Sequence, residues 1–307
     1  MSFSAAVKEE LCRAQLGKKC CAQAEAYGVL LFCNSFTAGE VKIVTEHPDL
    51  SLRLPPLFWK AFRIDFDIYP EVLGEPGKQV FGVREPEKLA TIWETYGYEP
   101  NSVAHHINYA VLEENCDRVS FLRGAFLAGG SVTDPGKGYH LELATSHYSV
   151  SRELSALMRE LGFSPKEATR KANYVTYFKS SSAIEDFLTT IGAPVQAMEI
   201  MNAKAEKQLR GGVNRRVNCD AANLDKTVDA AMEQLEAIRR VEESRGLDGL
   251  PDKLREAAAL RRAHPEMSLT ELAALCDPPV TKSAFNHRLR KLVSMAQALA
   301  EAEREPG

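Results

Sequence analysis

The stretch FLRGAFLAGGSVTDP, residues 121–135, predicts a helix built for close contact with a second helix. Small residues alternate in it with large apolar ones, namely Gly124, Ala125, Ala128, Gly129 and Gly130 with Phe121, Leu122, Phe126 and Leu127. A glycine inside a helix costs about 1 kcal/mol relative to alanine, so close backbone packing is needed to offset it. We therefore expect a helix seam at 116–129, and functional residues at one end of it.

A second stretch of the same kind lies 96 residues earlier. In AYGVLLFCN, residues 26–34, Gly28 takes the place that Gly124 has in the first stretch. Two later segments, LATIWETYG and IEDFLTTIG, end on Gly97 and Gly192, which are 95 residues apart. Two anchors with nearly one offset predict an internal duplication, with halves at about 1–97 and 115–192.

The hydrophobic periodicity predicts mixed helices and strands in both halves. In the first half we expect helices at 4–14, 21–34, 49–62 and 86–96 and strands at 40–44, 63–69 and 78–84. In the second half we expect helices at 116–129, 149–162 and 181–191 and strands at 139–145, 165–171 and 173–179. The predicted class is α+β, with two α/β halves joined by a pseudo-twofold helix seam in a domain at 1–195.

This arrangement resembles the LAGLIDADG homing endonucleases, whose motif forms a helix seam. In that family the final acid of each motif binds the metals that cleave DNA, since Mg²⁺ prefers oxygen ligands. The resemblance places these acids at Cys33 and Gly129, which offer no carboxylate. It therefore implies a scaffold without catalytic residues, and we predict no metal site and no cofactor.

Three acids were considered as relocated metal ligands. Asp134 precedes Pro-Gly, which is typical of a turn. Asp65 and Asp67 lie at i and i+2 of the expected strand at 63–69, and we interpret them as its solvent face. No phosphate-binding loop or H-E-x-x-H motif occurs.

Composition points to a globular protein that is not coated in nucleic acid. Hydrophobic residues make up 45% and charged residues 26% of 307 residues, and the formal net charge is −4. No apolar run approaches the roughly 18 residues of a membrane span, and the N-terminus has no signal-peptide pattern. We expect no membrane association.

The cysteines predict a reduced, cytoplasmic protein. Their number, seven, is odd and no C-x-x-C occurs. A metal site from Cys12, Cys20 and Cys21 was considered, but paired ligand spacing is absent and we do not predict one.

After Gly192 the sequence becomes helical. We expect a helix that is closed by Gly211 and Gly212, then a long amphipathic helix that Gly246 stops. The region 196–248 is predicted to be a helical linker with a basic segment. This segment contains one acid and five cations, which are Lys204, Lys207, Arg210, Arg215 and Arg216.

Residues 249–307 predict a three-helix domain of the helix-turn-helix type. Ser268 and Glu271 form a capping-box pattern before the second helix. In the third helix, which we expect to begin at Thr281, the predicted inward face is Ala284, Phe285, Leu289 and Leu292.

The opposite face of the third helix carries residue types that read DNA bases. We predict base contacts from Lys282, Ser283, Asn286, His287 and Arg290, and phosphate contacts from Arg288 and Lys291. Between 280 and 292 there are four Lys or Arg and no acids. The alternative is a three-helix bundle with a solvated basic face.

Taken together, FLRGAFLAGGSVTDP, YHLEL, NRRVNCDAANLDKT and the helix-turn-helix pattern make the chain similar to the WhiA family of Gram-positive bacterial regulators. The resemblance covers essentially the full length. It implies a DNA-binding transcription regulator tied to sporulation, cell division and chromosome segregation, with the helix-turn-helix supplying most of the DNA affinity.

The partners implied are double-stranded promoter DNA and other regulatory or cell-division proteins, with no small-molecule substrate. The implied location is the cytoplasm, at the nucleoid. Two alternatives remain open: a divergent metal-dependent homing endonuclease, and a division-machinery scaffold whose DNA contact is incidental.

Overall fold

The computed structural model describes residues 2–99 and 104–302. It divides into two compact units, Met1–Gln208 and Leu209–Gly307, and each has a hydrophobic core of its own. None of the helices in the described ranges combines the length and apolar composition needed to cross a membrane.

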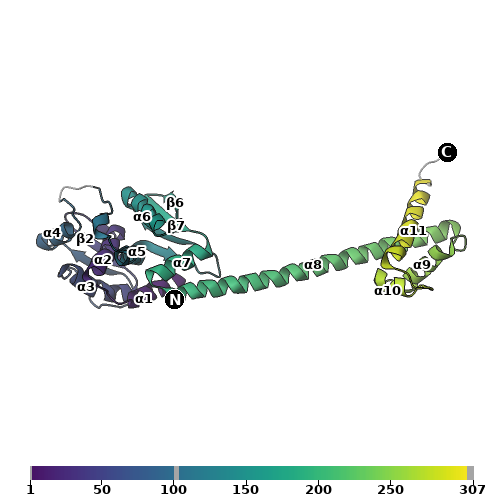
Figure 1. Cartoon of the computed structure of the whole chain (residues 1–307), viewed down its shortest axis with the longest axis horizontal. Helices are drawn as coiled ribbons and strands as arrows, with labels where there is room; N and C mark the ends of the chain where they lie inside the picture. Colours follow the sequence, from purple (N-terminus) through teal and green to yellow (C-terminus); the bar gives the residue numbers. More distant parts are fainter. Residues whose placement is uncertain (1, 100–103, 303–307) are drawn as a thin grey trace. The chain divides into compact units, whose positions relative to one another are not determined.

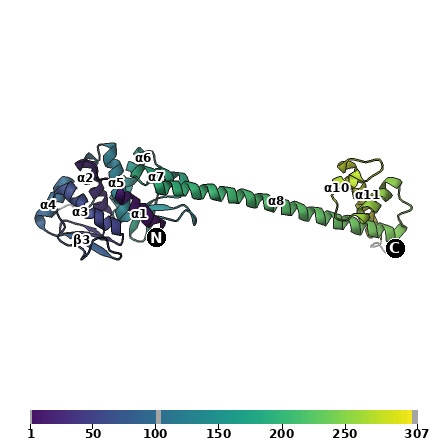
Figure 2. The same ribbon diagram turned by 90° about the horizontal axis from the view of Figure 1, so that it is seen from below.

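The predicted helix seam is the centre of the first unit. Helices α2 (Lys19–Phe32) and α5 (Asn115–Gly129) lie side by side in both ribbon views (Figures 1 and 2). A Cβ atom on Gly28 would lie 2.2 Å from the carbonyl oxygen of Phe121, and one on Gly124 would lie 2.0 Å from that of Glu25. The two backbones touch at these glycines, and this contact explains why both positions lack a side chain.

The first half of unit 1 contains α2, a three-stranded sheet and two further helices. The sheet is antiparallel with the order β1-β2-β3. Its elements in chain order are α2, β1 (Ser35–Phe36), β2 (Val41–Thr45), α3 (Pro48–Phe62), β3 (Gln79–Val83) and α4 (Pro86–Thr95).

The strand predicted at 63–69 is wrong. Only Ile68 pairs, in an isolated bridge with Gly82. Next to it, the carboxylate of Asp67 accepts hydrogen bonds from the backbone N–H groups of Arg84 and Glu85, at the start of α4. These side-chain hydrogen bonds hold the segment 63–69 at the end of β3, where the prediction had expected a longer run of backbone pairing between strands.

The second half of unit 1 repeats the order of the first. Its sheet is antiparallel with the order β4-β5-β7-β6, so β4, β5 and β7 correspond to β1, β2 and β3. The elements are α5, β4 (Gly130–Val132), β5 (Leu141–Thr145), α6 (Tyr148–Glu160), β6 (Lys166–Arg170), β7 (Asn173–Phe178) and α7 (Ser181–Ile191). The repeated order confirms the predicted class of two α/β halves about a helix seam.

A local detail shows the same duplication. Each middle strand ends in Thr-x-His, and the threonine hydroxyl accepts a hydrogen bond from the backbone N–H of that histidine. The two pairs are Thr45 with His47 and Thr145 with His147, at 3.0 and 3.3 Å. Each histidine then precedes the first residue of a helix, α3 or α6.

Two shorter elements complete unit 1. Helix α1 (Phe3–Arg13) packs against α3 and α5, and a single 3₁₀ turn (Tyr109–Val111) precedes α5. The predicted spacer 97–114 includes residues 100–103, which lie outside the described ranges.

The helix α8 (Pro194–Arg245) begins in unit 1 and ends in unit 2. The predicted end of a helix at Gly211 and Gly212 is therefore wrong. Neither glycine has a positive φ, and a Cβ on Gly212 would meet no atom within 4 Å. The helix loses about 1 kcal/mol at each glycine but is not broken there. Gly246, with φ +71°, does end α8 as predicted.

Unit 2 packs the last part of α8 against three helices. These are α9 (Asp252–Ala263), α10 (Leu269–Ala274) and α11 (Lys282–Ala302). Buried residues of all four form one core, with Ile238 and Val241 from α8, Leu254, Ala257 and Ala258 from α9, Leu272 and Ala273 from α10, and Phe285, Leu289 and Leu292 from α11.

Candidate nucleic-acid interface

Helices α10 and α11 have the local signals that the sequence predicted. Ser268 caps α10 by accepting from the backbone N–H of Glu271, and the Glu271 carboxylate accepts in return from the N–H of Ser268. Thr281 accepts from the N–H of Ala284 at 3.2 Å, which fixes the start of α11. The capping box and the N-cap are therefore confirmed.

Three of the four residues predicted for the inward face of α11 lie in the core of unit 2, and Ala296 of the same helix joins them. Phe285, Leu289 and Leu292 are fully buried, but Ala284 is exposed. Ala284 directly precedes the buried Phe285, but its own side chain is exposed. It therefore belongs to the outward face of α11.

That outward face carries the predicted base-reading residues. Lys282, Ser283, His287 and Arg290 are exposed, and Asn286 is half-buried at the edge of the face. Lys291, a predicted phosphate contact, is exposed as well. None of these side chains forms an ion pair within residues 2–99 and 104–302, so their polar groups are available to a partner.

Arg288 is placed differently from its neighbours. Its guanidinium donates to the Glu256 carboxylate of α9 at 2.8 Å, and it lies 3.7 Å from the sulphur of Cys276. Only 14% of the Arg288 side chain is exposed. The predicted phosphate contact from Arg288 thus competes with an ion pair that ties α11 to α9.

The five cations of the basic segment fall in both units of the chain. Lys204 lies 3.7 Å from Glu185 and donates to Ser182, and the Lys207 ammonium lies 5.6 Å from the centre of the Tyr139 ring. These two residues belong to unit 1. Arg210, Arg215 and Arg216 are exposed on the part of α8 that belongs to unit 2.

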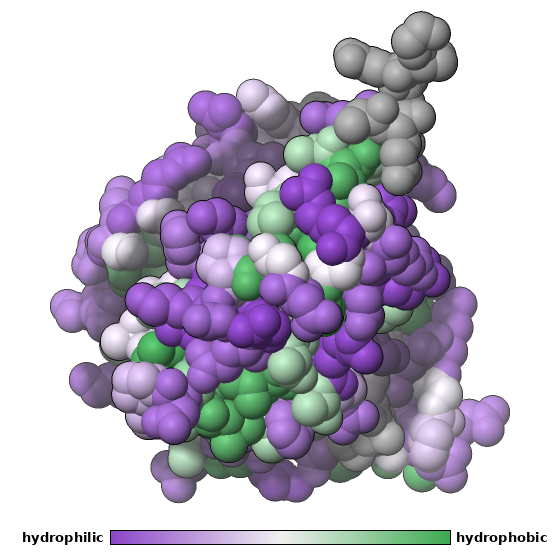
Figure 3. Space-filling model, turned by 90° about the vertical axis from the view of Figure 1, so that its right-hand side faces the viewer, coloured by the Kyte–Doolittle hydropathy of each residue, from purple (hydrophilic) through white to green (hydrophobic). Residues whose placement is uncertain are grey.

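The surface seen in Figure 3 is mainly hydrophilic, and hydrophobic residues form smaller patches on it. Such a surface suits contact with water or with a polar partner.

The carboxyl ends of α2 and α5 form the place where an endonuclease would hold its metals. A cavity of about 420 Å³ lies there, and Cys33, Lys8, Thr45 and His47 are among the residues that line it. Among the described residues that line it, Glu46 is the one with a carboxylate. Burial lowers the pKa of Lys8 to about 8 and raises that of the Cys33 thiol to about 12.

The two positions where acids are expected are filled in different ways. The Cys33 thiol donates to the carbonyl oxygens of Leu30 and Ser35, at 3.1 and 3.2 Å. A Cβ on Gly129 would lie 2.7 Å from the Ala144 carbonyl oxygen and 2.8 Å from the Phe32 ring. The residues present do not fit a pair of Mg²⁺ ions, because such a site needs several carboxylates.

The three relocated acids do not form a metal site either. Asp134 accepts from the backbone N–H of Gly136 at 2.8 Å, as expected of a turn. Asp67 accepts hydrogen bonds from the backbone at the start of α4 and from Lys88, while Asp65 is exposed.

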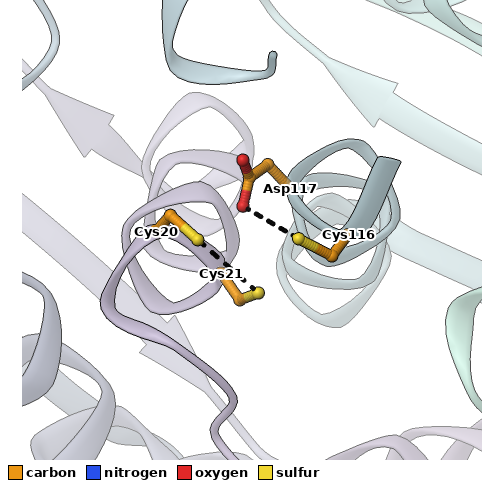
Figure 4. Close-up of side chains that lie close together, drawn as sticks. All are labelled: Cys20, Cys21, Cys116 and Asp117. Atoms are coloured by element: carbon orange, nitrogen blue, oxygen red, sulfur yellow. Dashed lines mark hydrogen bonds between the residues drawn. The ribbon is translucent and has the colours of Figure 1, made fainter. Parts of the chain in front are cut away.

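One cluster of possible metal ligands was not predicted from the sequence. Cys20 and Cys21 from the start of α2 meet Cys116 and Asp117 from the start of α5 (Figure 4). Cys12, which the sequence analysis had grouped with Cys20 and Cys21, is not part of it. The duplication could have predicted this cluster, because Cys20 and Cys116 are separated by the same 96 residues as Gly28 and Gly124.

Comparison with known proteins gives matches along the whole chain. The family model described as the WhiA LAGLIDADG-like domain matches residues 118–210, and that of the WhiA C-terminal HTH domain matches residues 213–296. The probable cell division protein WhiA of Ruminiclostridium cellulolyticum is 37% identical over 97% of this chain and 98% of its own length.

Two further matches agree with these. The probable cell division protein WhiA of Clostridium acetobutylicum is 35% identical over 99% of this chain and 100% of its own. The crystal structure of full-length WhiA from Thermotoga maritima matches with a TM-score of 0.59 and 25% identity, over 97% of this chain and 99% of that one.

Proposed function

The chain belongs to the WhiA family, and from that premise we propose that it is a sequence-specific DNA-binding transcription regulator. The observation that carries the proposal is the outward face of α11. It presents Lys282, His287, Arg290 and Lys291, which form no ion pair in the described part of the chain, on the third helix of a helix-turn-helix. An α-helix of this kind fits the major groove of B-DNA.

In the proposed complex, the side chains of α11 divide into two groups. Lys282, Ser283, Asn286, His287 and Arg290 face base edges, where asparagine suits adenine and arginine or lysine suits guanine. Lys291 and the exposed cations of the basic segment on α8 neutralise phosphates. Arg288 acts indirectly, by holding α11 against α9 through Glu256.

Salt titration tests the phosphate contacts. If about four to six phosphates are neutralised, the logarithm of the association constant falls with log salt at a slope of about −4 to −5. Lys291→Ala reduces the slope by about 1. Lys253→Ala, an exposed lysine on α9, is the matched control and leaves it unchanged. Binding that does not depend on salt contradicts the proposal.

A second experiment tests base reading. Asn286→Ala weakens binding to the specific site by about 1–3 kcal/mol and has little effect on random DNA. An equal loss on both DNAs assigns Asn286 to the backbone instead.

We further propose that unit 1 has lost nuclease activity. Cys33 and Gly129 supply no carboxylate at the ends of the seam helices. Incubation of the full chain with operator DNA and Mg²⁺ or Mn²⁺ leaves both strands intact on this proposal. Metal-dependent cleavage that scales with protein concentration identifies a divergent endonuclease.

The process served is proposed from the relatives, which are named probable cell division proteins. We place the chain at the nucleoid, acting on promoters of genes for cell division and chromosome segregation, and for sporulation where the host sporulates. Chromatin immunoprecipitation gives sharp promoter peaks for a regulator. Diffuse or absent signal indicates a division scaffold with incidental DNA contact.

A further inference from the structure

We propose that Cys20, Cys21, Cys116 and Asp117 form a tetrahedral Zn²⁺ site that joins the amino ends of α2 and α5. One ligand atom from each residue lies within 4.8 Å of all the others. Figure 4 shows the four side chains converging from the two helix ends. This site lies at the opposite end of the seam from Cys33 and Gly129.

The four residues occupy equivalent positions in the duplicated halves. Cys20 and Cys21 are the second and third residues of α2, and Cys116 and Asp117 are the second and third residues of α5. Both pairs are related by the 96-residue offset of Gly28 and Gly124. The pseudo-twofold relation of the seam thus brings two pairs of ligands face to face.

This symmetry suits tetrahedral coordination. A twofold axis of a tetrahedron passes through the midpoints of two opposite edges, so each helix supplies one edge. For Zn²⁺ the expected edges are about 3.8 Å between two sulphurs and about 3.5 Å between a sulphur and an oxygen. The observed values are 4.0 Å for Cys20 to Cys21 and 3.5 Å for Cys116 to Asp117.

The surroundings of Asp117 favour binding of a cation. Its carboxylate is almost fully buried, with 3% of the residue exposed, and it accepts a hydrogen bond from the thiol of Cys116. It takes part in none of the ion pairs found within residues 2–99 and 104–302. A buried carboxylate is costly without a charged partner. A bound cation provides that partner.

The ligand set selects the metal. Three sulphur ligands favour Zn²⁺ over Mg²⁺ or Ca²⁺, which take oxygen. Four protein ligands fill the tetrahedron and leave no open position for water, so the site is structural. The two helix N-termini add partial positive charge that offsets the negative charge of three thiolates and a carboxylate.

Cobalt substitution of the full chain tests the proposal. The protein is reduced, stripped with a chelator and titrated with Co²⁺. We expect one equivalent to bind, with the visible bands of tetrahedral cobalt and a thiolate charge-transfer band in the near ultraviolet. Added Zn²⁺ displaces the cobalt. At a hundredfold excess over its Kd, Zn²⁺ raises the melting temperature of unit 1 by about 5–10 °C.

The variants assign the ligands. Cys20→Ser and Cys116→Ser weaken binding at least tenfold and reduce the charge-transfer band, whereas Cys219→Ser, an exposed thiol on α8, changes neither. Asp117→Asn keeps the charge-transfer band and shifts the visible bands. If circular dichroism shows that a serine variant does not fold, this spectral shift of Asp117→Asn tests the ligand assignment instead. No tetrahedral cobalt spectrum in the reduced wild-type chain overturns the proposal. So does a Cys21–Cys116 disulfide, found by mass spectrometry, that forms in air even with Zn²⁺ present.

Discussion

At the scale of single residues, Gly28 and Gly124 set the distance between the two halves of unit 1. Each glycine lies directly against a backbone carbonyl of the partner helix, so no neighbouring side chain can move aside to make room. Helix propensity alone favours alanine at both positions by about 1 kcal/mol. The overlap of a Cβ with the facing carbonyl oxygen costs more than this gain, so glycine is the more stable residue at both positions.

Gly124→Ala is therefore expected to lower the free energy of unfolding of unit 1 by about 2–4 kcal/mol, because a Cβ there overlaps the Glu25 carbonyl. Both tryptophans, Trp59 and Trp93, lie in unit 1, so urea titration followed by tryptophan fluorescence measures this change. Gly212→Ala is the matched control: a Cβ there meets no atom within 4 Å, and because Gly212 belongs to unit 2 the fluorescence transition of unit 1 should stay unchanged. Equal effects of the two changes would show that the seam tolerates a methyl group.

The buried His105 and the half-buried His147 predict a pH dependence of the same unit. Burial lowers the pKa of His105 and of His147, and each lies near another histidine, His106 or His105, that lowers it further. The unfolded chain, with a histidine pKa of about 6.5, then binds more protons than the folded chain at acid pH. The free energy of unfolding of unit 1 is therefore highest above pH 6.5, where both histidines are neutral in either state. It decreases as the pH falls below 6.5.

The slope is about 1.4 kcal/mol per pH unit for each extra proton bound by the unfolded chain. Urea titrations between pH 7.5 and 5.5 measure it. His105→Gln with His147→Gln should flatten the profile in this range, whereas His287→Gln, an exposed histidine of unit 2, should not. A double variant as steep as the wild type would assign the dependence to other groups.

At the scale of elements, the sequence predicted what periodicity and repeats can specify. Helices of both halves were placed within a few residues because their apolar spacing is regular. The strand at 63–69 failed because alternation of buried and exposed residues does not reveal whether a partner strand pairs with it. The helix end predicted at Gly211 was wrong because two glycines lower the stability of a helix but do not end it. An end also needs a turn or a capping contact that replaces the next helical turn.

Three helices of unit 1 share one buried charge cluster. Glu25 of α2 accepts from Arg53 of α3 at 2.5 and 2.9 Å, and it lies 3.3 Å from Arg123 of α5. Glu25 is 2% exposed. Arg53 also donates to the backbone carbonyls of Cys12 and Ala14, so the cluster reaches the end of α1.

Glu25→Gln should cost about 3–5 kcal/mol of unfolding free energy, because it leaves two arginines without their counter-charge in a buried place. Fluorescence-detected urea titration again measures the change. Glu9→Gln removes an ion pair with the exposed Arg13 and should cost no more than about 1 kcal/mol. A loss below that of the control would mean that water or another acid compensates the arginines.

At the scale of the whole molecule, the chain has two cores and should unfold in two steps. Unit 1 contains both tryptophans, whereas unit 2 contains none. Ser268→Ala removes the cap of α10 and should cost about 0.5–2 kcal/mol in unit 2. Far-ultraviolet circular dichroism should detect this shift, while the fluorescence transition stays where it is. A shift of both signals together would show that the two units unfold as one.

The candidate interface was predictable from the sequence to the extent that it depends on one helix. The face of α11 follows from its apolar spacing, so Lys282, His287 and Arg290 were placed on the outside correctly. Arg288 differs because its partner, Glu256, comes from another helix. The cluster of Cys20 and Cys116 likewise needs two segments 96 residues apart, and only the register of the duplication relates them.

The packing at Gly129 has a consequence for which residues this position can accept. The position where the resemblance to endonucleases expects an acid is closed by Ala144 and Phe32, so a change to aspartate alone has no room for its side chain. A variant with an acid at this position needs compensating changes in β5 and at the end of α2. Each such change made alone removes contacts at the seam and lowers the stability of unit 1. A chain with an acid here is therefore reached only through intermediates that are less stable than the present one.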